Sequence, residues 1–179
     1  MERRDLLRWL ARVAGIYAVR GFAPADLLVF GNAVHRGAGS VTTEPGHVER
    51  TVLIAAERIL PGATEANVGG FIDKMLADWH TPEERGRLLA GLSDLDARCR
   101  ASAGRDFVDC TEPDQVAVLT SLDNEVTALR AGPGSERANQ HWFAMLKFLT
   151  VYGWCTSETG MRALGLHPAP WRYDGCAPV

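Results

Sequence analysis

Long apolar runs, a surplus of basic charge and closely paired cysteines are all missing from this sequence of 179 residues. No apolar stretch reaches the roughly 20 residues that a membrane-spanning helix needs, so the sequence predicts no transmembrane helix. The net charge is −3 and no basic stripe follows the first dozen residues, which argues against a nucleic-acid partner. The hydrophobic fraction of 46% is ordinary for a globular protein, and the length suits one domain with its own core.

Motifs that carry catalysis or bind cofactors are also missing. The glycines form neither the dinucleotide-binding pattern nor the phosphate-binding loop, and no serine lies in a nucleophile elbow. None of the five histidines has a second histidine four residues away, so the helical zinc pattern is absent. We therefore expect each histidine to lie at the surface or at a helix end, and the chain to hold no catalytic, metal-binding or cofactor-binding residues.

The four cysteines, Cys99, Cys110, Cys155 and Cys176, fit neither a C-x-x-C redox pair nor a zinc or haem-attachment pattern. Their number permits disulfides, but the sequence does not select among the pairings. Cys99 continues an apolar helical stripe and is expected to be an inert buried thiol.

Residues 1–25 resemble a twin-arginine export signal. Arg3 and Arg4 precede a leucine pair, and an apolar segment with a small-x-small cleavage site at residues 23–25 follows. Because Arg12 interrupts the apolar segment, the alternative is an amphipathic helix that stays on the protein. If the signal operates, the protein is exported folded and its cysteines meet an oxidising compartment.

The rest of the chain divides into a linker and a helical domain. Residues 26–46 carry scattered Gly, Pro, Ser and Thr, and are expected to form a linker or extended arm. Over residues 47–179 apolar residues recur at helical spacing, and no segment alternates with the period of a strand. We predict an all-α fold: a single compact bundle of about five to six helices, with an extended N-terminal arm and a C-terminal tail.

The helix boundaries follow from start and stop signals. The first helix is expected from His47 to Leu60, and a second, capped by Thr64, carries an apolar stripe that ends at Trp79. Thr81 and Glu84 form a capping-box pattern, and Thr111 opens a further helix that ends before Ala131-Gly132-Pro133-Gly134.

Aromatic side chains are concentrated in the last fifth of the chain, which is predicted to form a helix broken at Gly153, a short helix and an extended tail. Aromatic rings carry large apolar areas and dominate interface energetics, so this region is a candidate docking surface. The alternative is that the rings complete the core. The aromatic residues are Trp142, Phe143, Phe148, Tyr152, Trp154, Trp171 and Tyr173.

A series of short blocks resembles the gluconate 2-dehydrogenase subunit 3 family. Each block alone is weak, but they occur in the family's order over roughly residues 47–176. The blocks are residues 51–62, Val68-Gly-Gly-Phe-Ile-Asp73, 76–79, Thr81-Pro-Glu-Glu-Arg85, 148–153, Thr156-Ser-Glu158, Gly160 and Arg172-Tyr-Asp-Gly-Cys176.

The resemblance implies a small, non-catalytic subunit of a periplasmic dehydrogenase. Its large partner would bind FAD and oxidise a sugar, a sugar acid or a related alcohol, and a further subunit with haem c would accept the electrons. The small subunit would support assembly, stability and export of the flavin subunit by the twin-arginine route. It would lie peripheral to the inner membrane through its partners.

The resemblance also suggests which residues contact the partner. Cys155 stands where an aromatic residue is usual, and Pro170-Trp171-Arg172 replaces a usual Pro-Gly-Arg, which favours a divergent partner whose substrate is not gluconate. Cys176 is expected to be a contact or disulfide site, with Cys110, Cys155 or the partner as its mate. The candidate contacts are Trp142, Phe143, Tyr152, Trp154, Thr156, Ser157, Glu158, Trp171, Arg172, Tyr173, Asp174 and Cys176.

Two other functions remain open from the residues alone. One is a free-standing helical domain that binds a small apolar ligand between its helices. The other is an enzyme that uses the thiols, although no base or second cysteine lies close by in the sequence.

Overall fold

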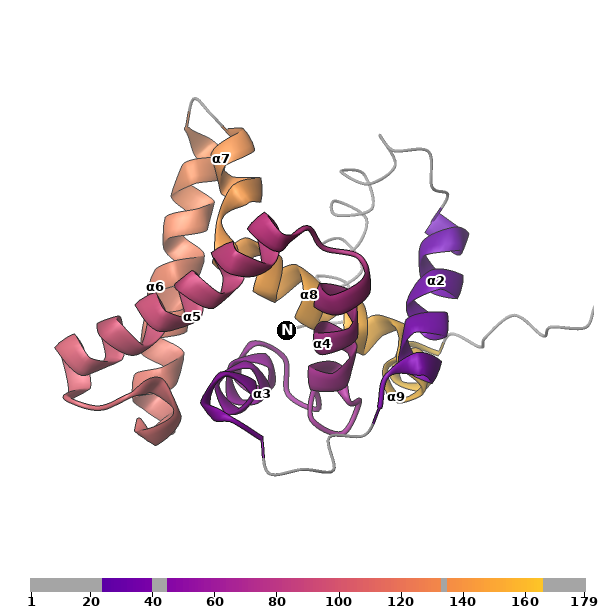
Figure 1. The fold of residues 1–179 in the computed structure, drawn as a ribbon, viewed down its shortest axis with the longest axis horizontal. Coiled ribbons are helices and arrows are strands. Elements are labelled where there is room, and N and C mark those ends of the chain that lie inside the picture. Colours follow the sequence, from indigo (N-terminus) through magenta and orange to yellow (C-terminus); the bar gives the residue numbers. More distant parts are fainter. Residues whose placement is uncertain (1–23, 40–44, 133–134, 166–179) are drawn as a thin grey trace, which may run out of the picture.

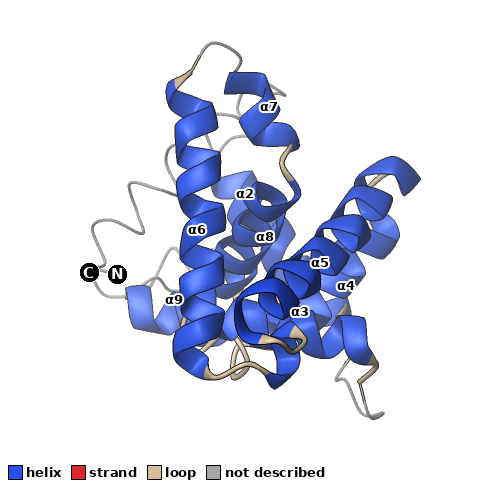
Figure 2. Cartoon of the chain, turned by 90° about the vertical axis from the view of Figure 1, so that its left-hand side faces the viewer, coloured by secondary structure: helices blue, strands red, loops and turns tan. Residues whose placement is uncertain are grey.

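The computed structural model describes residues 24–39, 45–132 and 135–165, which form eight α-helices and one short 3₁₀-helix (Figure 1). These residues contain no strand (Figure 2), which confirms the predicted all-α class, although the helices are more numerous than expected. Among them, no helix is both long and apolar enough to cross a membrane. In chain order the elements are α2 (Pro24–Gly37), α3 (His47–Ile59), α4 (Val68–Asp78), α5 (Pro82–Ala103), η1 (Phe107–Asp109), α6 (Glu112–Ala131), α7 (Ser135–Gln140), α8 (Trp142–Thr156) and α9 (Glu158–Leu164).

Helix α8 lies at the centre of the bundle, and α2, α3, α4, α5, α6, α7 and α9 all contact it (Figure 1). Its sequence is apolar almost all round, which is the pattern of a core helix rather than of an amphipathic surface helix. Leu146 and Leu149 are fully buried. Thr150 satisfies its buried hydroxyl locally by donating to the Leu146 carbonyl at 2.8 Å.

The structure corrects the break expected at Gly153, because α8 continues through this residue to Thr156. A glycine is needed there for packing: a Cβ atom would lie 2.7 Å from the Phe71 ring of α4. The helix ends at Ser157, whose hydroxyl accepts the Gly160 amide at 2.9 Å and starts α9.

The expected extended arm is also corrected, since residues 24–37 form α2 and pack against α4 and α8. The Tyr152 hydroxyl donates to the Leu27 carbonyl at 2.6 Å, and Val34 is buried. Gly31 faces Thr156 so closely that a Cβ atom would lie 2.5 Å from the Thr156 methyl group. Contacts with α8 therefore stabilise this helix, and local sequence gives little sign of them.

The predicted start signals are confirmed at α5 and corrected at α4. Thr81 Oγ1 accepts the Glu84 amide at 3.2 Å, and Glu84 returns a bond to the Thr81 amide at 3.0 Å. Helix α4 begins at Val68 rather than after Thr64, because residues 61–67 form turns and Asn67 has a positive φ of 51°.

Candidate partner-binding surface

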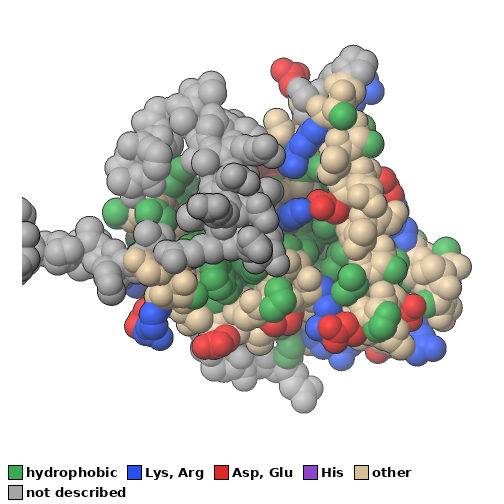
Figure 3. Space-filling model, turned by 180° about the vertical axis from the view of Figure 1, so that it is seen from behind, with side chains coloured by type: hydrophobic (Ala, Val, Ile, Leu, Met, Phe, Trp, Pro, Cys, Tyr) green, Lys and Arg blue, Asp and Glu red, His purple; other side chains and the backbone are tan. Residues whose placement is uncertain are grey.

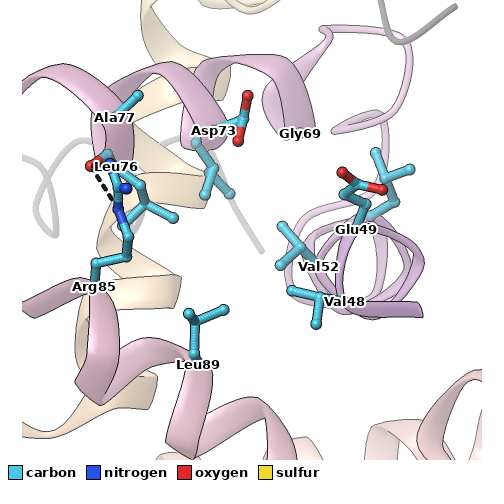
Figure 4. Close-up of a pocket in the computed structure, with 11 residues that line it drawn as sticks. Val48, Glu49, Val52, Gly69, Asp73, Leu76, Ala77, Arg85 and Leu89 are labelled. Atoms are coloured by element: carbon cyan, nitrogen blue, oxygen red, sulfur yellow. Dashed lines mark hydrogen bonds between the residues drawn. The ribbon is translucent and has the colours of Figure 1, made fainter. Parts of the chain in front are cut away.

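An apolar groove lies between α3, α4 and α5 and has a volume of about 290 Å³. In Figure 4, α4 crosses above the groove and α3 is seen end-on at its side, while Val48, Val52 and Leu89 point into the space between the helices. Two of these side chains remain accessible: Val48 is 44% exposed and Leu89 is 43% exposed.

Gly69 lies at a close contact between α4 and α3 beside the groove. A Cβ atom at this position would lie 2.4 Å from Leu53 Cδ2, so a larger residue would require the Leu53 side chain to move. This glycine of the family-like block at residues 68–73 is therefore in contact with a neighbouring helix.

Side chains from outside α4 cap its C-terminal end. Arg85 of α5 donates to the Leu76 carbonyl from Nη2 at 2.6 Å and from Nε at 3.2 Å, as the dashed lines in Figure 4 show. The His80 ring nitrogen Nδ1 lies 3.0 Å from the Met75 carbonyl. A positive group at this end also suits the helix dipole, so Arg85 joins α4 to α5 and fixes one side of the groove.

Trp79, the residue that follows α4, presents the largest exposed aromatic surface of the described residues. It is 61% exposed and packs edge-to-face on Phe30 of α2, with ring centroids 4.5 Å apart. The sequence predicted an apolar stripe that ends at Trp79, and the structure corrects this prediction because Trp79 is exposed. The name apolar surface is used below for the exposed side chains of Val48 and Leu89 at the groove, together with Trp79, which lies outside the groove lining and beside α2.

Charges near this surface are few and mixed. Glu49 and Asp73 contribute carboxylates to the groove lining, and Glu49 accepts a bond from the Gly46 amide at the start of α3. The groove lining thus carries both signs of charge, since Arg85 lies there too, and this suits an apolar contact with a polar rim. On the opposite face of the molecule, seen in Figure 3, basic and acidic side chains also lie interspersed.

Most of the described candidate contacts from the aromatic region lie inside the bundle. Trp142, Phe143, Tyr152 and Thr156 are buried, with Trp142 held against Gly91 of α5. They complete the core of the chain itself, which is the alternative that the sequence left open.

The remaining candidate contacts differ in accessibility. Ser157 is buried and caps α9, whereas the side chain of Glu158 is 84% exposed and pairs with Arg162 at 2.7 Å. Trp154 is half-buried, and its indole N–H is buried without an acceptor among the described residues. Those outside the described residues are Trp171, Arg172, Tyr173, Asp174, Cys176, and the export-signal residues Arg3 and Arg4.

His47, Asp96 and Asp106 bring three potential metal-ligand atoms within 4.8 Å of one another. The carboxylates of Asp96 and Asp106 are already hydrogen-bonded to other groups of the protein. Asp96 bonds His47 Nε2 at 2.6 Å and the Phe107 amide at 2.9 Å, and Asp106 bonds Arg100. The cluster is thus explained as a structural junction between α3, α5 and η1.

Burial shifts the pKa values of one histidine and one cysteine toward their neutral forms. Burial lowers the pKa of His35, although its contact with the Gly153 carbonyl at 2.5 Å opposes this effect. His35 also stacks on Phe71 of α4, so it belongs to the contacts of α2 with α4 and α8 as well as to a helix end. Burial raises the pKa of the Cys155 thiol to about 12, which makes it a poor nucleophile at neutral pH.

A family model for gluconate 2-dehydrogenase subunit 3 matches residues 47–175. The chain belongs to the gluconate 2-dehydrogenase subunit 3 family. Comparisons with curated proteins and with solved structures found no match. For a subunit 3 chain, the position of the apolar surface is informative, because two of the family-like blocks, residues 76–79 and Thr81–Arg85, lie beside it.

Sequence reasoning missed the apolar surface, although a signal for it was present. Apolar residues in and next to α3, α4 and α5 include three that are exposed, namely Val48, Trp79 and Leu89. Because exposure depends on how the helices are spaced, a stripe alone does not tell a core residue from a contact residue.

Proposed function

We propose that this chain is a non-catalytic accessory subunit that binds the FAD-dependent large subunit of a dehydrogenase acting on sugars, sugar acids or related alcohols. The family match carries this proposal, since it makes the chain one component of a gluconate 2-dehydrogenase-like complex. The flavin subunit would hold the FAD, and a cytochrome c subunit would take up the electrons.

The apolar surface is the proposed contact with the flavin subunit. Interfaces depend on a few buried aromatic and aliphatic anchors inside a polar rim. Trp79 and Leu89 offer such anchors: Trp79 directly follows α4, and Leu89 lies in α5. The residues of the C-terminal tail, including Trp171 and Tyr173, are proposed as a second part of the same interface.

Substitution of the anchors tests this contact. Trp79→Ala and Leu89→Ser should each weaken binding of the flavin subunit about tenfold or more, because truncation of an anchor typically costs about 1–2 kcal/mol or more. The measurement is the flavin that co-purifies with the tagged chain, together with the dissociation constant of the purified pair.

Leu129→Ser is the matched control, since Leu129 of α6 is also partly exposed at 37% but lies outside the apolar surface. It should leave binding unchanged. If all three variants bound the flavin subunit as tightly as the wild type, the apolar surface would not be the contact. Absence of any flavoprotein in the native complex would remove the proposed function itself.

Binding of a small apolar ligand in the groove is the second candidate. The groove volume of about 290 Å³ supports it only weakly, because ligand pockets usually range from about 300 to 1,000 Å³ and enclose most of the ligand. The accessible side chains at the groove favour a protein contact.

A further inference from the structure

One face of α4 forms a side of the groove between α3, α4 and α5. The α4 residues in the groove lining recur at helical spacing: Gly69, Ile72, Asp73, Leu76 and Ala77. Asp73 therefore places a single carboxylate in the middle of a face that is otherwise apolar. This residue is exposed, and in the view of Figure 4 it lies between Glu49 and Arg85.

The other two charged residues of the groove lining interact with helix ends of this chain. Glu49 accepts a hydrogen bond from the Gly46 amide at the start of α3, where the helix dipole favours a negative charge. Arg85 donates to the Leu76 carbonyl near the end of α4, where the dipole favours a positive charge. Each of these two charges thus has a local partner.

The Asp73 carboxylate has no such partner within the described ranges. Asp73 lies in the middle of α4, away from both helix ends, and no hydrogen bond or ion pair joins it to residues 24–39, 45–132 or 135–165. The basic residue next to it, Lys74, is paired with Asp78 at 2.8 Å. The Asp73 carboxylate is therefore available to a basic group that enters the groove.

The groove offers side chains rather than backbone groups to an occupant. Its lining comes from three α-helices, which bond most of their backbone groups internally, so it presents no row of free groups like that of a strand edge. An extended segment would bury its own N–H and C=O groups there without partners, whereas a helix satisfies these groups itself. The occupant that fits is a helix with one apolar face.

We propose that the flavin subunit lays the apolar face of an amphipathic helix in this groove and pairs a lysine or arginine of that helix with Asp73. This inference rests on the proposed function, and it names the element and the charge that the partner contributes. The apolar side chains of the helix contact Val48 and Leu89, which are accessible at the groove. The basic residue lies at the edge of the apolar face and meets Asp73 in the polar rim.

Charge substitutions at Asp73 test the pairing. The dissociation constant between the full-length chain and the flavoprotein that co-purifies with it is measured at low and at high salt. Asp73→Asn should weaken binding about two- to fivefold at low salt, and less at high salt, because salt screens an exposed ion pair. Asp73→Lys should weaken binding about tenfold or more, since two like charges then face each other.

Asp78→Asn is the matched control, because Asp78 lies on the same helix but outside the groove lining and is paired with Lys74. It should leave binding unchanged. If Asp73→Lys bound as tightly as the wild type while Trp79→Ala weakened binding, the pairing would be wrong and the proposed function would stand. If no flavoprotein co-purified with the wild-type chain, the proposed function would fail and the pairing with it.

A photo-cross-link identifies the element that enters the groove. The photoreactive residue p-benzoylphenylalanine replaces Ala77, which lines the groove one turn after Asp73 and is exposed. After illumination of the complex, mass spectrometry should find the cross-link on a helix of the flavin subunit that carries a basic residue beside apolar residues at helical spacing. A cross-link to residues 1–23 of this chain, to a second copy of it or to an extended segment of the partner would overturn the proposal, as would the absence of any cross-link to the flavin subunit.

Discussion

Single polar side chains join the helix ends of this fold. Gln115 is buried, accepts a bond from Arg58 at 2.9 Å and donates to two carbonyls around η1. The Asp96 carboxylate is bonded to His47 of α3 and accepts a hydrogen bond from the Phe107 amide. A buried polar group without partners costs about 1–3 kcal/mol, so each of these side chains is stabilising only because every contact is made.

His35 makes the α2–α8 contact sensitive to pH. Because burial lowers its pKa in the folded chain, the unfolded chain binds a proton first as the pH falls below about 6.5. The free energy of unfolding should therefore fall between about pH 7 and pH 5. His35→Gln keeps a donor toward the Gly153 carbonyl but cannot titrate, so its free energy of unfolding should fall less over the same range.

Urea unfolding of the wild type and of His35→Gln at several pH values measures this difference. Burial also lowers the pKa of His141, which is present in both proteins, so the difference between them isolates His35. Parallel pH profiles would show that protonation of His35 does not weaken the fold.

At the scale of elements, glycines decide how closely helices approach α8. A Cβ atom at Gly91 of α5 would lie 2.1 Å from the Trp142 ring of α8, whereas one at Gly86 of the same helix would meet no atom within 4 Å. Gly91→Ala should therefore destabilise the protein by about 1–3 kcal/mol through overpacking. Gly86→Ala should stabilise it by up to about 1 kcal/mol, because alanine is the better helix former.

Urea unfolding of both variants gives the two free-energy changes directly. Opposite signs would confirm that Trp142 packs across Gly91. If both substitutions stabilised the helix, Trp142 would lie elsewhere and would again be a candidate for the interface.

The elements that the sequence predicted are those with local signals. The capping box at Thr81 predicted the start of α5, and the apolar stripe that Cys99 continues predicted its buried face. The residues at helical spacing before it, Leu88, Leu92 and Leu95, are buried together with Cys99. Helix α2 was missed because its stability comes from distant partners such as Tyr152. The six-residue α7 was missed because it has no apolar stripe of its own.

The candidate site was less predictable than the fold. Trp142 and Phe143 were candidates for an interface because aromatic residues are concentrated in this part of the chain. Helix α8 is apolar almost all round, so periodicity does not show which of its sides faces the core. Exposure of Trp79 depends on where α4 ends against α2 and α5, which no local pattern encodes.

At the scale of the whole molecule, we propose that this chain also supports export of its flavin partner by the twin-arginine route. Arg3→Lys together with Arg4→Lys should leave both this chain and its flavin partner in the cytoplasm, because the twin-arginine route recognises the arginine pair and carries folded cargo. Cell fractionation followed by immunoblotting measures the distribution. Arg8→Lys, a similar change outside the pair, should leave export intact, and a partner exported equally in all strains would contradict the proposal.

The family match begins at residue 47, but the folding unit begins earlier. Helix α2 supplies the acceptor for the Tyr152 hydroxyl and covers Thr156 through Gly31. A fragment cut at the boundary of the family would expose this side of α8 to water, and an uncovered apolar face invites aggregation. The range that matches the family and the range of helices that pack together are therefore two different lengths of chain.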